Sequence, residues 1–206
     1  MEYFAGLDLG PVNEPSALAV VGKQVTAGVS AYAVRHLVRW QAGSMSYRDM
    51  AAEVDGVLRL PELGRCPLVI DRTGVGESVA ALFRKLSDSS RSVVLSTGHA
   101  VTVGEDGSWY LPKQELVGTL QLLLQERRFQ VAASLPLAAL LTKEMANFRA
   151  KVVPAGTDPV TDWREGPQDD LVLAVGIAVW QGESDPGDAG MPLTWDDWGR
   201  PSRWPY

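Results

Sequence analysis

The sequence predicts an α/β fold: a mixed sheet of three antiparallel strands followed by parallel strands, flanked by helices. Its first 40 residues hold three apolar or alternating runs separated by turn residues, the pattern of an antiparallel meander. Short apolar runs then alternate with runs of helical period, and a helix between two strands implies a parallel crossover. The last regular segment, residues 171–180, is wholly apolar or glycine. It is too short to cross a bilayer, and it favours a helix buried on most of its surface.

The three meander strands are predicted at residues 3–10, 16–22 and 30–40. The first, YFAGLDLG, is apolar and runs into Gly-Pro, with Asp8 at a position where a buried strand would prefer an apolar residue. The third alternates with period two over residues 32–40. We expect residues 23–28 to form the hairpin loop between the second and third strands.

Helices and strands alternate after the meander. Ser46 and Asp49 resemble a capping box, which opens a helix over residues 46–60. Pro112 stands where a first helical residue is expected, ahead of an amphipathic helix over residues 113–128. Further helices are predicted at residues 77–86, at 137–148 and after Asp169, and further strands at 67–71, 92–96, 101–103, 109–111 and 129–132. Residues 149–153 are expected to be extended, and 158–165 to form a polar loop.

Composition indicates an ordinary soluble protein. With 206 residues, 46% of them hydrophobic, and a net charge of −6, the chain can bury a sizeable core but lacks the basic excess of a nucleic-acid-coating protein. An enzyme that meets DNA through a local basic patch and metal ions is still compatible. The start of the chain lacks the pattern of a signal peptide, and the single cysteine, Cys66, fits a reducing cytosol. We therefore expect a cytoplasmic protein without membrane association.

Two regions are expected. Residues 1–181 form the folded domain, and residues 182–206 form an acidic tail rich in glycine, proline and tryptophan without periodicity. The tail tryptophans, Trp195, Trp198 and Trp204, would either pack back on the domain or anchor a partner, and we favour packing.

Aspartates stand at the ends of three predicted elements. Asp8 lies in the first strand, Asp71 ends the strand over residues 67–71, and Asp169 and Asp170 precede the apolar helix. Three strands, a helix, a parallel strand, another helix, a strand and a final helix is the element order of a ribonuclease H-like fold. In that geometry Asp8 and Asp71 lie on neighbouring strands, and Asp170 reaches in from the last helix.

Converging carboxylates repel one another unless cations neutralise them. Hard oxygen ligands select Mg²⁺ or Mn²⁺, and no Cys/His cluster in the sequence competes for a softer metal. Two such ions about 3.5 to 4 Å apart can activate a water and stabilise the leaving oxygen of a phosphodiester. Asp8, Asp71 and Asp170 are the expected ligands, and Asp169 is either a fourth ligand or the helix cap.

Each acid also has a structural interpretation. Asp169 and Asp170 suit a helix start, because capping and the helix dipole favour negative side chains there. Asp8 would then be a strand-end residue, and Asp71 an acceptor for the amides of the turn that follows it. The occurrence of all these acids in this order favours a site.

Five segments resemble the nuclease domain of phage large terminase subunits: GLDLG with SALAVVG, VIDRTGVGESVAALFRK, PKQELVGTLQLLLQERRF, LTKEMANFR and PQDDLVLAVGIAVW. The resemblance spans residues 3–180. It implies a ribonuclease H-like, Mg²⁺- or Mn²⁺-dependent endonuclease that cuts double-stranded concatemeric DNA during packaging. Its acidic motifs fall on Asp8, Asp71 and the pair Asp169/Asp170, and Asp170 is preferred as the catalytic ligand because the apolar run begins directly after it.

The resemblance also implies a bacterial host cell, a phage or prophage origin, and partners among a separate packaging ATPase, a portal and a small terminase subunit. The sequence lacks G-x-x-x-x-G-K-[ST], so the chain is not itself the packaging motor and no nucleotide cofactor is expected. Gln168 stands where the family often has a histidine, which loses a ligand or proton carrier. Arg72 and Lys113 are candidate phosphate contacts, although each also suits a solvated surface.

Two alternatives stay open, and a third is set aside. A Holliday-junction resolvase has the same acid layout and would prefer branched DNA as an obligate dimer. A catalytically silent ribonuclease H-like scaffold would keep the fold, although retention of the acids speaks against it. Sugar-kinase and actin-like ATPases share the opening strand-turn-strand but need a second such half, for which the chain is too short. Glu144 shares a helix face with Leu140 and Leu141, and is either structural or near the DNA path.

Overall fold

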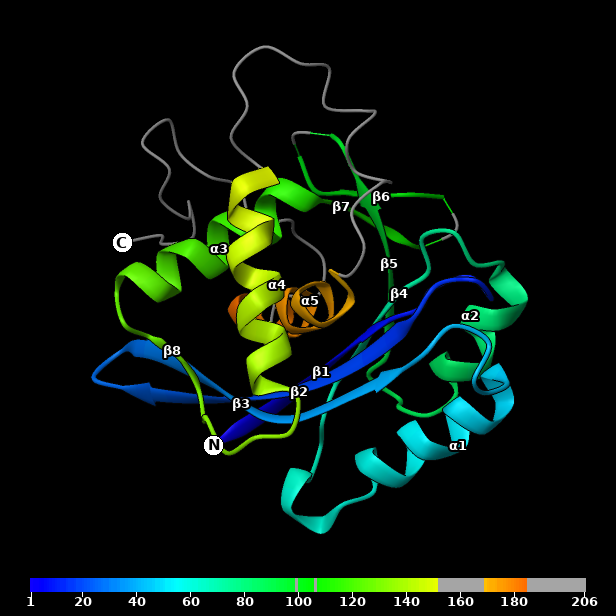
Figure 1. Cartoon of the computed structure of the whole chain (residues 1–206), viewed down its shortest axis with the longest axis horizontal. Helices are drawn as coiled ribbons and strands as arrows, with labels where there is room; N and C mark the ends of the chain where they lie inside the picture. Colours follow the sequence, from blue (N-terminus) through cyan, green and yellow to red (C-terminus); the bar gives the residue numbers. More distant parts are fainter. Residues whose placement is uncertain (99, 106, 152–168, 185–206) are drawn as a thin grey trace.

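The computed structural model describes residues 1–98, 100–105, 107–151 and 169–184, and its centre is one eight-stranded mixed sheet (Figure 1). The strand order is β6-β7-β5-β4-β1-β2-β3-β8. The strands are β1 (Glu2–Asp8), β2 (Ser16–Thr26), β3 (Val29–Trp40), β4 (Leu68–Asp71), β5 (Arg91–Ser96), β6 (Thr102–Val103), β7 (Trp109–Pro112) and β8 (Phe129–Val131). β1, β2 and β3 pair antiparallel, whereas β4 joins β1, and β5 joins β4, in parallel.

Helices cover both faces of the sheet. They are α1 (Tyr47–Leu58), α2 (Glu77–Arg84), α3 (Lys113–Gln125), α4 (Ala138–Lys151) and α5 (Asp170–Glu183), with a 3₁₀ turn at Pro61–Leu63. Apolar side chains of α1 and α2 form one core with one face of the sheet, and those of α3, α4 and α5 form a second core with the other face (Figure 1). The middle of β1 and the first seven residues of β2 therefore bury both of their alternating faces, which explains the near-continuous apolar runs there.

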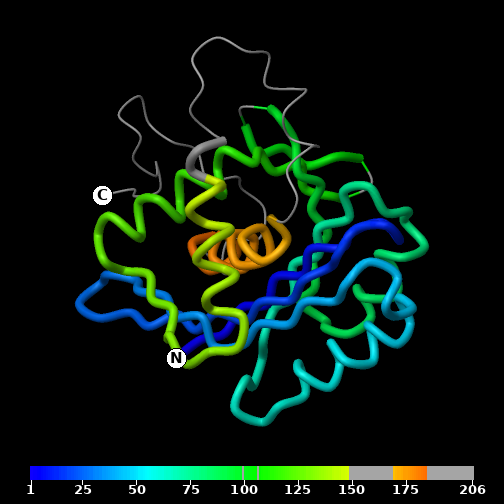
Figure 2. Tube along the Cα trace, in the orientation of Figure 1, coloured from blue at the N-terminus to red at the C-terminus, as the bar shows by residue number. Residues whose placement is uncertain are grey.

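Helix α5 is the innermost helix. Every residue from Asp170 to Gly182 is buried, because α5 lies on β1 and β2 and is covered in turn by α3 and α4 (Figure 2). A Cβ atom at Gly6 of β1 would lie 2.0 Å from the carbonyl oxygen of Ala174, so only glycine permits this approach. At the other end of α5, the Tyr32 hydroxyl donates to Glu183 Oε1 at 2.6 Å and Lys23 Nζ donates to the Gly182 carbonyl at 2.5 Å.

A β-bulge changes the face of β3 partway along the strand. The pairing between β2 and β3 shifts between Val20 and Val21, where Arg35 is the extra residue. Tyr32 and Val34 before the bulge, and Leu37 after it, all pack in the α5 core. Strict alternation over residues 32–40, as predicted from the sequence, is therefore wrong. The bulge turns Arg39 toward α5.

The predicted α/β, ribonuclease H-like mixed sheet is confirmed, with corrections at element ends. Residues 149–151 continue α4, so the predicted extended segment is wrong there. The predicted hairpin loop over residues 23–28 is shorter, because β2 runs to Thr26 and only Ala27 and Gly28 turn, with φ of 51° and 80°. Pro112 ends β7 and caps α3 instead of beginning it.

Helix α5 ends at Glu183, two residues past residue 181, the expected end of the folded domain. The predicted loop over residues 158–165 and the tail tryptophans lie outside the described residues. Within the described part of the chain, none of the helices has the length and apolar character needed to cross a membrane.

Candidate active site

One row across the sheet brings the predicted acids together. In the parallel pairing of β1 with β4, Asp8 is opposite Asp71. On the other side of β1, Asp8 is opposite Ala17 of β2, and Ala17 is opposite Arg39 of β3, so the row runs from Asp71 to Arg39. Neighbouring strands are about 4.8 Å apart, so the two carboxylates are immediate neighbours. Asp8 is in phase with Phe4, which packs in the α5 core, and the whole row therefore faces α5.

Asp8 and Asp71 share one electrostatic environment. Burial raises the pKa of Asp8 well above its ordinary value, and the charges of Asp71, Asp169 and Asp170 raise it further, whereas Lys113 opposes them. Burial also raises the pKa of Asp71, against hydrogen bonds from Thr73, the charge of Lys113 and the side chain of Asp8. Two ionised carboxylates side by side are therefore unfavourable here, and a cation between them would relieve the repulsion.

Asp71 is also tied into the turn after β4. The amide and the hydroxyl of Thr73 both donate to Asp71 Oδ1, at 2.8 and 2.6 Å, and the Thr73 hydroxyl accepts from the Leu95 amide at 2.8 Å. This is the turn contact expected from the sequence. Because it uses only Oδ1, it fixes the carboxylate while Oδ2 takes no part in these bonds. The structural and functional interpretations of Asp71 are therefore compatible.

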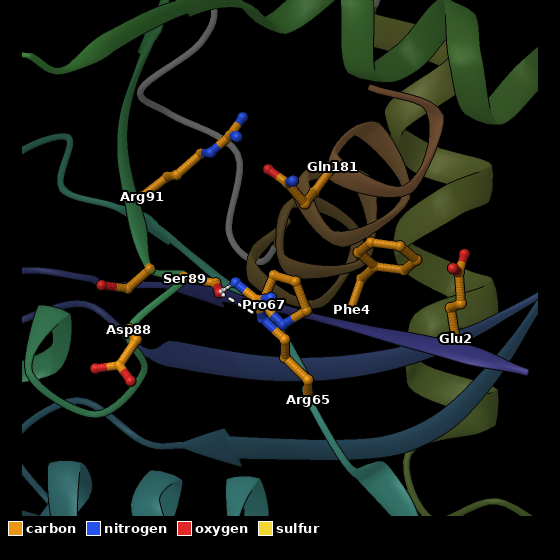
Figure 3. Close-up of a pocket in the computed structure, with 9 residues that line it drawn as sticks. Glu2, Phe4, Arg65, Pro67, Asp88, Ser89, Arg91 and Gln181 are labelled. Carbon is orange, nitrogen blue, oxygen red and sulfur yellow. Dashed lines mark hydrogen bonds between the residues drawn. The ribbon is translucent and has the colours of Figure 1, made fainter. Parts of the chain in front are cut away.

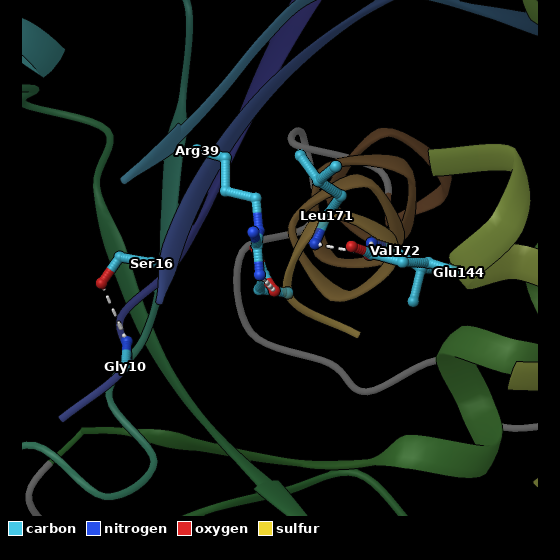
Figure 4. A network of polar contacts seen from close by, with 7 residues as sticks. Gly10, Ser16, Arg39, Glu144, Leu171 and Val172 are labelled. Atoms are coloured by element: carbon cyan, nitrogen blue, oxygen red, sulfur yellow. Dashed lines mark hydrogen bonds and ion pairs between the residues drawn. The ribbon is translucent and has the colours of Figure 1, made fainter. Parts of the chain in front are cut away.

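Asp170 is held by a buried arginine. Arg39 donates from Nε to Asp170 Oδ2 at 2.7 Å and from Nη2 to Oδ1 at 3.1 Å, and both side chains are about 95% buried, with 6% and 5% exposed (Figure 4). Arg39 can cross the sheet surface to reach α5 because the residue between it and Asp8 in the row is Ala17. Both oxygens of Asp170 thus accept hydrogen bonds from a bidentate cation.

Glu144 of α4 reaches the same helix start. Its Oε2 accepts from the backbone amides of Leu171 and Val172, at 2.9 and 3.1 Å (Figure 4). The side chain is 2% exposed, and its Oε1 has no hydrogen-bond partner among the described residues. Burial, followed by the charge of Asp170, raises the pKa of Glu144 to about 7.

The two candidate phosphate contacts differ in position. Lys113, at the start of α3, lies close enough to lower the pKa of both Asp8 and Asp71, so it belongs to the acid site. Arg72 donates from Nε and Nη2 to the hydroxyl of Ser108 at 3.1 and 2.9 Å, which ties the turn after β4 to the hairpin of β6 and β7. These bonds give Arg72 a structural role.

The donor set suits a hard divalent cation. Asp8 and Asp71 supply adjacent carboxylates whose mutual repulsion a cation would relieve, and such oxygen donors match Mg²⁺ or Mn²⁺. As arranged, the described residues contain no group of three or more His, Cys, Asp or Glu side chains that could hold a metal. A third carboxylate would join a cation at the pair only by moving closer to it, and Asp169 and Asp170 are the α5 acids whose charges act on Asp8.

A cavity of about 500 Å³ lies elsewhere, at the opposite end of β1 (Figure 3). Its lining includes Glu2 and Phe4, Arg65, whose guanidinium donates to the Ser89 hydroxyl, and Arg91. Glu2 is six residues before Asp8, which places the cavity about 20 Å along the strand from the acids. The acid site is therefore distinct from this cavity.

Arg39 was not predicted from the sequence as a site residue, and Glu144 was predicted to be either structural or near the DNA path. Arg39 lies on the strand that the pattern treated as strictly alternating, and the bulge that turns it inward has no mark in the sequence. Glu144 does carry a signal. It is an acid in phase with the buried Leu141, and an acid on a buried helix face requires a donor.

Comparison with known proteins supports the fold. No protein-family model and no curated protein matches the chain. Two solved structures of the large terminase nuclease from thermophilic phage G20c, one with bound zinc, share its fold, with TM-scores of 0.57 and 0.53 and sequence identities of 17% and 18%. Each covers 87% of this chain, which in turn covers 82% and 81% of those chains. T. thermophilus RuvC in complex with a Holliday junction substrate aligns with a TM-score of 0.37 and 14% identity.

Proposed function

We propose that the chain is a metal-dependent endonuclease that hydrolyses phosphodiester bonds of double-stranded DNA, similar to the terminase nuclease that cuts concatemeric phage DNA. The observation that carries this proposal is the pairing of Asp8 with Asp71 at the ends of adjacent parallel strands, directly beneath the acidic start of α5. The fold shared with the G20c terminase nuclease supports it independently.

The proposed cofactor is a pair of Mg²⁺ or Mn²⁺ ions, which when bound would supply an activated water and stabilise the leaving oxygen. Asp8 and Asp71 would hold the cation between neighbouring strands. The sequence favoured Asp170 as the third ligand, but Arg39 engages both of its oxygens. We therefore assign the third position to Asp169 and a supporting position to Asp170.

The remaining side chains have distinct tasks in this proposal. Lys113, beside the acid pair, would contact the phosphate that approaches the cations. Arg72 would stabilise the turn after Asp71 through Ser108 and act on DNA only indirectly. The proposed partners are double-stranded DNA and a packaging ATPase, a portal or a small terminase subunit.

The test is cleavage of supercoiled plasmid by the whole chain with Mn²⁺, Mg²⁺ or EDTA, beside Asp71→Asn. Asparagine keeps the side-chain shape and can accept the Thr73 bonds, so the variant should fold while losing a metal ligand. We expect nicking and linearisation that require metal and that disappear in the variant. Equal cleavage by wild type and Asp71→Asn, or no cleavage with either metal, would overturn the proposal. A four-way junction run in parallel tests the branched-DNA alternative.

A further inference from the structure

The start of α5 is capped by a residue from another helix. Asp169 occupies the N-cap position, and an N-cap side chain ordinarily accepts from the amide of the second or third helical residue. In α5 these amides belong to Leu171 and Val172. Asp169 makes no side-chain bond to them, and Glu144 of α4 accepts from both (Figure 4).

This arrangement is costly for the fold. Glu144 is 2% exposed, and its second oxygen has no partner among the described residues. A buried, half-paired carboxylate destabilises a protein, whereas Asp169 stands at the position from which it could cap the same helix without that burial. Glu144 therefore supplies a cap that Asp169 is placed to supply, and the Asp169 side chain is engaged elsewhere.

The three acids around the start of α5 make different interactions. Asp170 pairs with Arg39, and Glu144 accepts from the free amides of α5. Asp169 is half-buried and, of the two α5 acids, raises the pKa of Asp8 more strongly than Asp170 does. A carboxylate that capped its own helix would be turned to the amides and away from that position.

We propose that Glu144 is a positioning residue: by capping α5 from α4, it keeps Asp169 from capping its own helix and directs Asp169 toward Asp8 and Asp71 as a metal ligand. The ligand part rests on the proposed function, whereas the capping part stands on the geometry alone. When Glu144 is truncated, Asp169 takes over the cap, and the metal site loses its third carboxylate.

The first test measures Mn²⁺ affinity by calorimetry on protein without DNA, so that no cleavage takes place. Glu144→Ala should weaken binding by about 10- to 100-fold, the usual effect of removing a residue that orients a ligand. Glu144→Gln keeps an oxygen in the same place and should bind Mn²⁺ within about twofold of wild type. Ser46→Ala is the matched control, because it removes the cap of α1, where the Ser46 hydroxyl accepts from the Asp49 amide at 3.2 Å. It should lower the melting temperature without changing Mn²⁺ affinity.

The second test needs no metal. In EDTA, the effect of Asp169→Ala on the melting temperature of wild type contains no cap term, since Asp169 makes no cap bond there. In the Glu144→Ala background, the same substitution should lower the melting temperature by about 2 to 4 °C more than it does in wild type, because Asp169 has become the cap. This difference between the two backgrounds is the signature of the exchange of caps.

The outcomes separate the two proposals. If wild type binds Mn²⁺ and Glu144→Ala binds it equally well, the positioning role is wrong even though the site stands. If wild type fails to bind Mn²⁺ or to cleave DNA, the proposed function and the ligand part fall together. If Asp169→Ala has the same effect in both backgrounds, the capping part is overturned.

Discussion

Replacement of Gly6 by alanine should loosen the contact between α5 and the sheet. The new Cβ would lie 2.0 Å from the carbonyl oxygen of Ala174, 2.7 Å from Ile177 Cγ1 and 2.9 Å from the Ala178 amide nitrogen. Real Cβ contacts essentially never fall below 3.0 Å, and two of these atoms are backbone, so α5 must move away from β1 by about 1 Å. Overpacking of a core typically costs about 1–3 kcal/mol, and a helix buried on all sides favours the upper end, about 3 kcal/mol.

The displacement should also reach the acids, because Asp8 is two residues from Gly6 and α5 carries Asp169. We expect Gly6→Ala to lower the free energy of unfolding in urea by about 3 kcal/mol, or the melting temperature by about 6–12 °C, and to weaken Mn²⁺ binding in the folded protein. Gly118→Ala is the control: this α3 glycine has open space around its Cβ position, and the change should stabilise by up to about 1 kcal/mol. A Gly6→Ala protein as stable as wild type would refute the close packing of α5 on β1.

Three further predictions concern the charges. Arg39→Met should destabilise the protein by about 3–5 kcal/mol in urea unfolding, since it leaves Asp170 buried and unpaired. Adding Asp170→Asn should recover part of this loss. If the effects of the two substitutions are additive, the two side chains do not stabilise each other. In EDTA, the raised pKa of Asp8 makes its contribution to stability complete below the ordinary carboxyl pKa and lost as pH rises through the raised value. Asp8→Asn should therefore melt at a higher temperature than wild type near pH 8 and at no higher temperature near pH 4. Equal melting temperatures of variant and wild type at both pH values would contradict the repulsion. Mn²⁺ at 100 times its dissociation constant should stabilise wild type by about 2.7 kcal/mol, and Asp71→Asn should abolish this shift.

The order and type of elements could be predicted from the sequence because local patterns determine them. Apolar runs gave β1, β2 and β4, and the run after Asp170 gave α5, with errors confined mainly to element ends. Asp8 and Asp71 were predictable as neighbours because the element order matched a ribonuclease H-like fold, in which the strands that end at these residues lie side by side in parallel.

Contacts between distant residues could not be predicted in the same way. The bulge near Val20 and Val21 depends on how two strands pair, and it alone decides that Arg39 faces α5 and meets Asp170. The cap of α5 by Glu144 joins residues 27 and 28 positions apart. The sequence left open whether Asp169 is a ligand or a cap, because it did not reveal that another helix supplies the cap.

The most direct test of the metal site is anomalous diffraction at the manganese edge from crystals of the whole chain grown with Mn²⁺. We predict an anomalous peak at the ends of β1 and β4, within ligating distance of Asp8 and Asp71, with Asp169 as the third carboxylate. Well-ordered density for both strand-end aspartates without any peak beside them would contradict the account.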